Sequence, residues 1–149
     1  MNKKIVTKSS LETIELGRRI GEKLTPGTVL LLDGDLSAGK TTLTKGIGEA
    51  LGIKRIINSP TFNILKEYHG VYRMYHLDLY RLNGLNNDYE FFDYIDGDGV
   101  CVIEWPNQVP ELLPSEYLKL IMTIKGDFRE IELIPVGEKY EKIVGELNV

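Results

Sequence analysis

One segment of eight residues constrains the fold of this chain more than any other. Residues 34–41 read GDLSAGKT, which matches the pattern G-x-x-x-x-G-K-[ST] in full. A short apolar run over residues 29–32 precedes the segment, and a stretch with helical character over about 40–51 follows it. Buried strand, glycine loop and helix in this order form the context in which such a loop binds phosphate. The segment therefore predicts a nucleotide site in an α/β fold.

Each fixed position of this loop has a chemical reason. Glycine at positions 34 and 39 permits backbone angles and a close approach that a Cβ would block. Successive N–H groups can then turn inward onto phosphate oxygens. We expect Lys40 to reach the β- and γ-phosphates as a point charge and Thr41 to offer its hydroxyl to Mg²⁺. The residues expected to contact the nucleotide are Gly34, Ser37, Ala38, Gly39, Lys40, Thr41, Thr42 and Thr61.

Composition limits the classes of function. The chain has 149 residues, with 18 Lys and Arg against 22 Asp and Glu, and the net charge of −4 argues against a domain that grips nucleic acid through phosphates. A single cysteine excludes an internal disulfide and a Cys-based zinc site, and it fits a reducing compartment. The sequence shows neither a signal peptide nor an apolar run near the ~20 residues that span a bilayer. We expect one domain over residues 1–149, cytoplasmic in location.

The rest of the chain predicts strands and helices around the loop. Two hairpins are expected over 62–78 and 117–135, turning at 69–70 and 126–127, so the sheet cannot be purely parallel. A buried strand is expected over 100–103, stopped by Pro106. The other expected elements are strands at 5–7 and 56–57 and helices over 10–24, 86–95 and 137–146, the first of these with a capping box at 9–12.

Three further blocks carry a family resemblance. They are SPTF at 59–62 followed by KEY at 66–68, then YHLDLYRL at 75–82, and then VIEWP at 102–106. With the glycine loop, and in this order over about residues 29–135, they resemble the TsaE (YjeE/YdiB) family of small P-loop ATPases. Leu112-Leu113-Pro114 and Arg129 fit more weakly. Ser37 stands where the family usually has glycine, but its N–H can still point inward.

The resemblance implies a fold and a function. The fold is a single-domain, three-layer P-loop NTPase-like α/β fold with central parallel strands flanked by antiparallel strands. The activity is slow, Mg²⁺-dependent hydrolysis of ATP to ADP. It serves the complex that makes threonylcarbamoyladenosine at position 37 of tRNAs reading ANN codons. The usual partners are TsaD and TsaB, so contact with tRNA would be indirect, and neither DNA nor a membrane is involved. The resemblance also assigns Glu104 to the metal.

Two carboxylates are candidates for the chemistry. Glu104 ends an apolar strand, where P-loop proteins place an acid that holds Mg²⁺ or orients the attacking water; the alternative is a solvated carboxylate. Asp78 ends the first hairpin, and near phosphate it needs a cation, so it acts with Mg²⁺ or water, or else caps the next turn. The predicted catalytic residues are Lys40, Asp78 and Glu104, and the predicted metal ligands are Thr41 and Glu104.

Several other residues allow two interpretations. Thr61 either senses the γ-phosphate in a switch loop or begins a strand. His76 has no nearby cysteine or second histidine at ligand spacing, so we expect a hydrogen-bonded core histidine rather than a base. Trp105 serves packing or anchors an interface. Arg81 either pairs with a carboxylate or contacts phosphate or a partner. The acidic stretch over 88–98 either forms a solvated helix or meets a basic surface of a partner.

Two other functions compete with an accessory ATPase. A P-loop kinase for a small molecule would need a lid that carries arginines over the phosphates. The chain has six arginines and no inserted segment in which they cluster. The third possibility is a binding module that nucleotide stabilises and in which hydrolysis is incidental.

Overall fold

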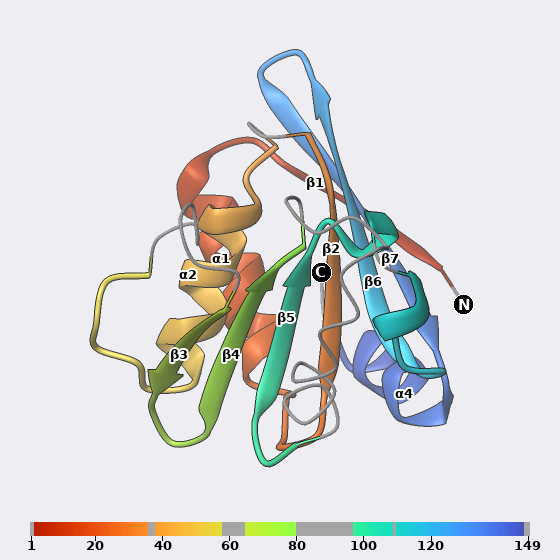
Figure 1. The fold of residues 1–149 in the computed structure, drawn as a ribbon. Coiled ribbons are helices and arrows are strands. Elements are labelled where there is room, and N and C mark those ends of the chain that lie inside the picture. Colours follow the sequence, from red (N-terminus) through yellow and green to blue (C-terminus); the bar gives the residue numbers. More distant parts are fainter. Residues whose placement is uncertain (1, 36–37, 58–64, 80–96, 109, 148–149) are drawn as a thin grey trace.

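A mixed β-sheet organises the described part of the chain (Figure 1). The computed structural model describes residues 2–35, 38–57, 65–79, 97–108 and 110–147. Its strands are β1 Lys3–Thr7, β2 Val29–Gly34, β3 Leu65–His69, β4 Arg73–Asp78, β5 Val100–Glu104, β6 Tyr117–Lys125 and β7 Phe128–Val136. Its helices are α1 Ser10–Gly21, α2 Lys40–Ala50 and α4 Glu138–Gly145, with the 3₁₀ turns η2 Pro106–Gln108 and η3 Pro110–Leu112.

The strands lie in the order β1-β7-β6-β2-β5-β4-β3. Strands β6, β2, β5 and β4 are parallel neighbours, whereas β7 pairs antiparallel with β6 and β1, and β3 antiparallel with β4. Parallel strands flanked by antiparallel ones confirm the predicted α/β fold. Because the four parallel strands point the same way, their carboxyl ends meet along one edge of the sheet, where ligands bind in such folds.

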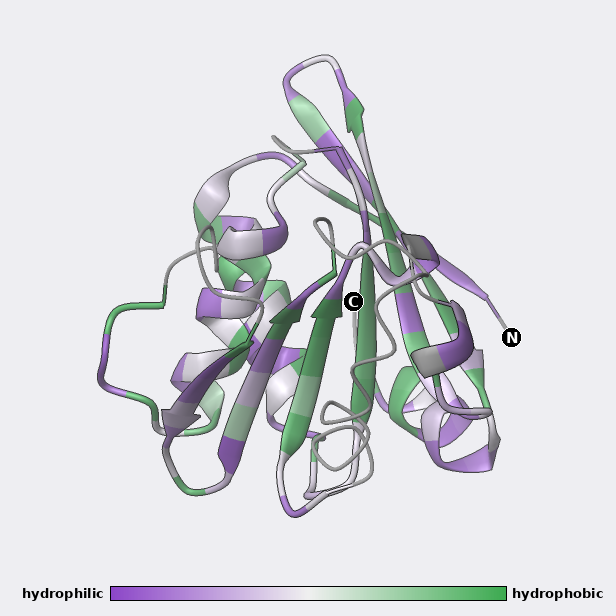
Figure 2. Ribbon diagram, viewed as in Figure 1, coloured by the Kyte–Doolittle hydropathy of each residue, from purple (hydrophilic) through white to green (hydrophobic). Residues whose placement is uncertain are grey.

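Both faces of the central strands are buried, as the apolar runs predicted. Alternate residues of β2 and β5, among them Leu30, Leu32 and Val102, join the cluster beneath α1, α2 and α4. Their neighbours, among them Leu31 and Cys101, form a smaller cluster on the opposite face. Figure 2 shows β2 and β5 as largely hydrophobic ribbons. Cys101 is fully buried, which agrees with the predicted core role.

Most predicted elements are confirmed, with small differences at their ends. The first helix ends at Gly21 rather than 24, because Leu24 is buried from a turn that follows the helix. The strand predicted at 56–57 is wrong. Ile57 packs against α2 at Gly48 while Ile56 is exposed, and no strand pairs with this segment in the described residues. The helix predicted over 86–95 lies outside the described residues. None of the described helices has the length and apolar character needed to span a membrane.

Helices α1 and α2 approach each other closely through glycines. A Cβ built on Gly46 would lie 2.0 Å from the backbone oxygen of Ile14, and one on Gly17 would lie 2.2 Å from that of Leu43. Such distances are far below van der Waals contact, so any larger residue would push the helices apart. Because α2 carries the glycine loop at its first turn, this packing sets the position of the loop over the sheet.

We predict that Gly46→Ala lowers the free energy of unfolding by about 1–3 kcal/mol, the usual cost of overpacking. Urea unfolding followed by circular dichroism measures it. Gly145→Ala is the matched control, because nothing lies within 4 Å of a Cβ at that helical position. Equal stabilities for the Gly46→Ala variant and the wild type would show that the helices tolerate separation.

Candidate functional site

The glycine loop joins the end of β2 to the start of α2. Gly34 has φ 146°, and a Cβ there would lie 2.4 Å from the backbone oxygen of Met122 on β6. Gly39 precedes α2 with φ 100°, a left-handed conformation that residues with a side chain rarely adopt. Both fixed glycines of the sequence pattern therefore meet a steric requirement of the fold.

The first turn of α2 is built to face an anion. The first bond of the helix runs from the N–H of Leu43 to the oxygen of Gly39, so the N–H groups of Lys40, Thr41 and Thr42 have no acceptor within the helix. The first turn carries no acidic residue, and Gly39 offers no side chain as a cap. These amides, which lack an acceptor within the helix, and the positive end of the helix dipole favour negative charge here.

The structure does not support a nucleotide contact for every residue predicted to make one. The N–H of Ala38 donates to the oxygen of Asp35 at 3.0 Å, so this amide is engaged within the loop. Ser37 and Thr61 lie outside the described residues, as do Arg81 and most of the acidic stretch over 88–98. Their predicted roles, and that of Ala38, stay predictions.

The ammonium group of Lys40 is buried at the carboxyl ends of the parallel strands. The residue is 3% exposed, and its Nζ donates to the backbone oxygen of Gly34 at 2.7 Å. The same Nζ lies 3.9 Å from Oε1 of Glu104 and 3.9 Å from the centroid of the Trp105 ring. Burial lowers the pKa of Lys40, and the nearby carboxylates, Glu104 foremost, oppose that shift.

The two candidate carboxylates lie next to each other at the strand ends. Asp78 and Glu104 are register partners on the parallel strands β4 and β5. Glu104 is 3% exposed, which excludes the alternative of a solvated carboxylate, and Asp78 is half-buried. Asp78 also raises the pKa of Lys40 through its charge. The structure thus brings Lys40, Asp78 and Glu104 together, and their catalytic roles stay predictions.

Two neighbours of this group have more specific contacts than the sequence indicated. His76 is fully buried, as expected of a core histidine, but its Nε2 lies 2.5 Å from Oε2 of Glu104. Trp105 adopts φ 57°, unusual for a residue with a side chain, and its N–H donates to the oxygen of Leu32 at 3.3 Å. Trp105 packs against the smaller apolar cluster, which confirms the packing role expected of it, and its ring also lies beside the ammonium group of Lys40.

The side chains present fit a magnesium ion that binds together with phosphate. In the described part of the chain, no three His, Cys, Asp or Glu residues are grouped as a complete metal site. Mg²⁺ that binds together with a nucleotide needs fewer protein ligands, because one or two protein oxygens suffice when phosphates and waters supply the other ligands. A buried carboxylate at Glu104 and the hydroxyl of Thr41 in the first turn of α2 provide such oxygens.

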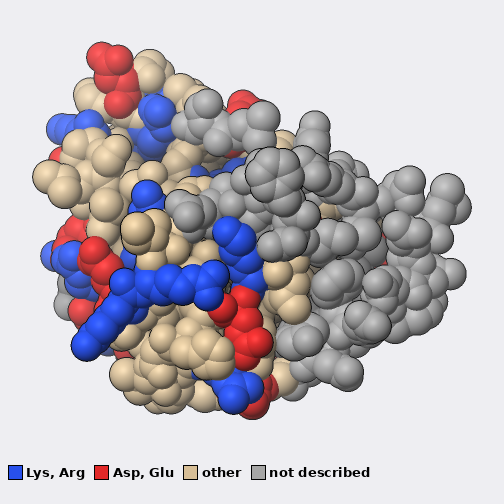
Figure 3. All heavy atoms as spheres, turned by 60° about the vertical axis from the view of Figure 1, so that its left-hand side comes forward, with Lys and Arg blue, Asp and Glu red and all other residues tan. Residues whose placement is uncertain are grey.

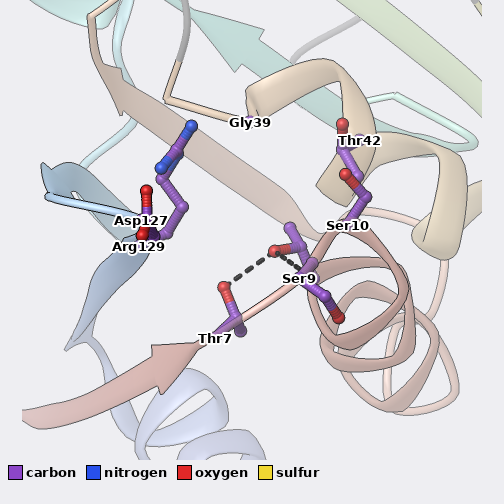
Figure 4. Close-up of a pocket in the computed structure, with 8 residues that line it drawn as sticks. Thr7, Ser9, Ser10, Gly39, Thr42, Asp127 and Arg129 are labelled. Carbon is purple, nitrogen blue, oxygen red and sulfur yellow. Dashed lines mark hydrogen bonds between the residues drawn. The ribbon is translucent and has the colours of Figure 1, made fainter.

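A pocket of about 330 Å³ opens beside the first turn of α2, between α1, β1 and the β6–β7 hairpin (Figure 4). Figure 4 shows Arg129 reaching from the hairpin toward Gly39, across from the hydroxyl groups of Ser10 and Thr42. The residues that line the pocket are Thr7, Ser9, Ser10, Thr13, Gly39, Thr42, Asp127 and Arg129.

Sequence reasoning missed this pocket. Ser9 and Ser10 were interpreted as helix caps, and Ser9 does cap α1 by accepting from the N–H of Glu12 at 3.1 Å. Asp127 was interpreted as a turn residue. Gly39 and Thr42 had a functional signal as expected nucleotide contacts, and among the other lining residues only Arg129 had one, as a weak part of the resemblance. Because the pocket combines three segments distant in sequence, no local pattern could indicate it.

Comparisons with known proteins identify the family. The model of the family "Threonylcarbamoyl adenosine biosynthesis protein TsaE" matches residues 7–131. The chain belongs to the TsaE family. A TsaE protein of Bacillus subtilis is 50% identical over 125 residues, covering 83% of this chain and 79% of that protein. One of Treponema pallidum is 40% identical over 127 residues, covering 82% and 92%. A crystal structure of Bacillus subtilis YdiB is 41% identical with a TM-score of 0.85, covering 98% of this chain and 93% of that one.

The shifted pKa of Lys40 predicts how stability of this TsaE protein depends on pH. The folded pKa lies below the ordinary value of 10.5, so between the two values the unfolded chain binds more protons and stability rises with pH. We expect Lys40→Met to remove this rise. Urea unfolding from neutral pH to about pH 10.5 measures it.

Lys45→Met serves as the control, because Lys45 is exposed on the same helix. This variant should keep the pH dependence of the wild type. If the difference in unfolding free energy between wild type and Lys40→Met does not change with pH, the prediction is wrong.

Proposed function

We propose that this protein is an ATP-binding, slowly hydrolysing, Mg²⁺-dependent ATPase that assists the threonylcarbamoyladenosine modification of tRNA. The observation that carries the proposal is the convergence of Lys40 and Glu104 at the first turn of α2, in a chain of the TsaE family. The names of its relatives refer to tRNA threonylcarbamoyladenosine biosynthesis. As in the sequence analysis, the modified base is at position 37 of tRNAs reading ANN codons.

The phosphate end of ATP is assigned to the loop and the first turn of α2. The amides of Lys40, Thr41 and Thr42 supply donors, and the Lys40 ammonium supplies a charge, whose present partners are the Gly34 oxygen and Glu104. A triphosphate offers stronger acceptors than a backbone carbonyl, so the ammonium gains by turning to it.

The nucleoside end is assigned to the pocket beside α2. The pocket borders the same first turn through Gly39 and Thr42, so ribose and base lie within one nucleotide's reach of the phosphate loop. Its volume of about 330 Å³ is at the low end of the range for small-molecule sites. The hydroxyls and the Arg129–Asp127 wall offer hydrogen bonds and a cationic plane for the base.

Hydrolysis would follow the general scheme of P-loop enzymes. Glu104 and Thr41 would hold magnesium, which would supply positive charge to offset that of the phosphates. Lys40 holds the γ-phosphate, and Glu104 or Asp78 orients the water that attacks it, with ADP and phosphate as products. Turnover by the isolated chain is slow, because a charge-stabilising group from a partner completes the site.

The proposed partners are the TsaD and TsaB homologues, with tRNA contacted indirectly. In the described part of the face drawn in Figure 3, positive and negative side chains lie side by side rather than forming one basic surface. Arg18 on α1 pairs with Glu15 on the same helix and with Glu49 on α2, the latter at 2.6 Å. Such a face attracts phosphate chains weakly, in keeping with the net charge of −4. A tRNA-modifying role implies a cytoplasmic location.

We expect the two ends of the nucleotide site to respond differently to mutation. Lys40→Met should weaken binding of both ATP and inorganic tripolyphosphate by about 10- to 100-fold, because it removes a charged hydrogen-bond donor. Arg129→Ala should weaken ATP but not tripolyphosphate. Isothermal titration calorimetry with Mg²⁺ measures both. Lys125→Ala, an exposed position on the same hairpin, is the control. Equal losses for both ligands in Arg129→Ala would contradict the assignment of the pocket.

The cellular role predicts a chemical phenotype. Depletion of the protein should lower threonylcarbamoyladenosine in bulk tRNA, measured by nucleoside mass spectrometry, and wild-type protein should restore it. Normal levels after depletion would refute the role.

The Glu104→Gln variant distinguishes an ATPase from a binding module. If a variant that binds ATP but cannot hydrolyse it restores threonylcarbamoyladenosine in the depleted cells, the result would favour the binding module. Faster phosphoryl transfer to a nucleoside or sugar than to water would favour a kinase.

A further inference from the structure

We propose that His76 is a positioning residue that holds one oxygen of Glu104 and so presents the other oxygen to the bound magnesium and nucleotide. The inference rests on the proposed function and extends it to a side chain that is not among the residues lining the pocket. It assigns His76 a task that sequence reasoning did not give it.

The two oxygens of the Glu104 carboxylate have separate partners. Oε2 lies 2.5 Å from Nε2 of His76 and forms a buried hydrogen bond with it. Oε1 lies 3.9 Å from the Nζ of Lys40. A carboxylate held at one oxygen cannot rotate freely, so the direction of Oε1 is set by the histidine.

The hydrogen on the imidazole is assigned by its surroundings. A carboxylate oxygen only accepts, so Nε2 carries the hydrogen and donates it to Glu104. Nδ1 is buried and has no hydrogen-bond partner in the described part of the chain. Leucine or phenylalanine would fill a fully buried position without that unpaired nitrogen. The benefit of a histidine here therefore comes from Nε2 and its bond to Glu104.

The sheet fixes where the ring lies. Asp78 and Glu104 are register partners, and His76 stands two residues before Asp78 on β4, paired with Val102. Residues two apart on a strand share a face. His76, Asp78 and Glu104 are thus on the face covered by α2, whereas Leu77 belongs to the cluster on the opposite face. Because β4 is hydrogen-bonded to a strand on each side, the imidazole ring of His76 is attached to a rigid element.

The contacts do not make His76 a catalytic residue. It is fully buried, and Glu104 lies between it and Lys40. Partners of this type orient a metal ligand, and their removal typically costs about 10- to 100-fold in metal affinity. The expected effect of losing His76 is therefore on magnesium rather than on the nucleotide itself.

The test measures the gain in ADP affinity that Mg²⁺ produces, by calorimetry with and without the ion. His76→Leu should reduce this gain by about 10- to 100-fold and leave the affinity for ADP without Mg²⁺ unchanged. His76→Gln should keep most of the gain, because its amide nitrogen reaches as far as Nε2. His76→Asn, which is too short to reach Glu104, should lose the gain. Electron paramagnetic resonance of Mn²⁺ with ADP gives a second, direct readout.

A double-mutant cycle separates positioning from general damage. Adding His76→Leu to Glu104→Gln should lower the gain no further, since the histidine acts through that carboxylate. Leu77→Ala is the matched control: it is equally buried and adjacent but faces the other cluster, so it should lower stability and leave the gain intact. If His76→Leu does not fold, the comparison of His76→Gln with His76→Asn decides.

Three results would overturn the inference. They are a wild-type gain in His76→Leu or His76→Asn, an equal loss when His76→Leu is added to Glu104→Gln, and a matching loss in Leu77→Ala. Wild-type protein that binds no adenine nucleotide would overturn the proposed function and this inference together. Binding of ADP with a normal Mg²⁺ gain in every His76 variant would overturn this inference alone.

Discussion

The buried ammonium group of Lys40 is the charge around which the site is arranged. Removing this charge from water is unfavourable, and burial accordingly lowers the pKa of Lys40. Three groups offset that cost: the Gly34 oxygen, the Glu104 carboxylate and the face of the Trp105 ring. They come from the end of β2, the end of β5 and the residue after β5. The contacts of this one ammonium group therefore bring together segments that are about 65–70 residues apart in sequence.

Strand direction makes this convergence possible. Because β2, β5 and β4 are parallel, Gly34, Glu104 and Asp78 all stand at the same edge of the sheet. The close contact of α1 with α2 then holds the first turn of α2 above that edge. The left-handed backbone of Trp105 costs roughly 1–2 kcal/mol, and the contact of its ring with Lys40 helps to offset that cost.

Local patterns in the sequence predicted the parts of the structure that local physics determines. The strand and helix that flank the glycine loop, the buried strands and the turn at 126–127 depend on neighbouring residues, and these predictions are confirmed, whereas the first hairpin turns at 70–72 rather than 69–70. The strand at 56–57 failed because β-branched residues favour extended backbone without indicating whether a partner strand is available. The bond between His76 and Glu104 depends on the register of β4 against β5, which one sequence does not reveal. The pocket depends on packing between three distant segments.

The position of the single thiol has a consequence for observing this molecule. Cys101 is fully covered in β5, a central strand with hydrogen-bonded neighbours on both sides. A water-soluble alkylating reagent cannot reach its sulfur unless the face of the sheet that carries the smaller apolar cluster becomes uncovered. The chain therefore carries a natural chemical reporter at its centre, and the rate of thiol modification records how often the core opens.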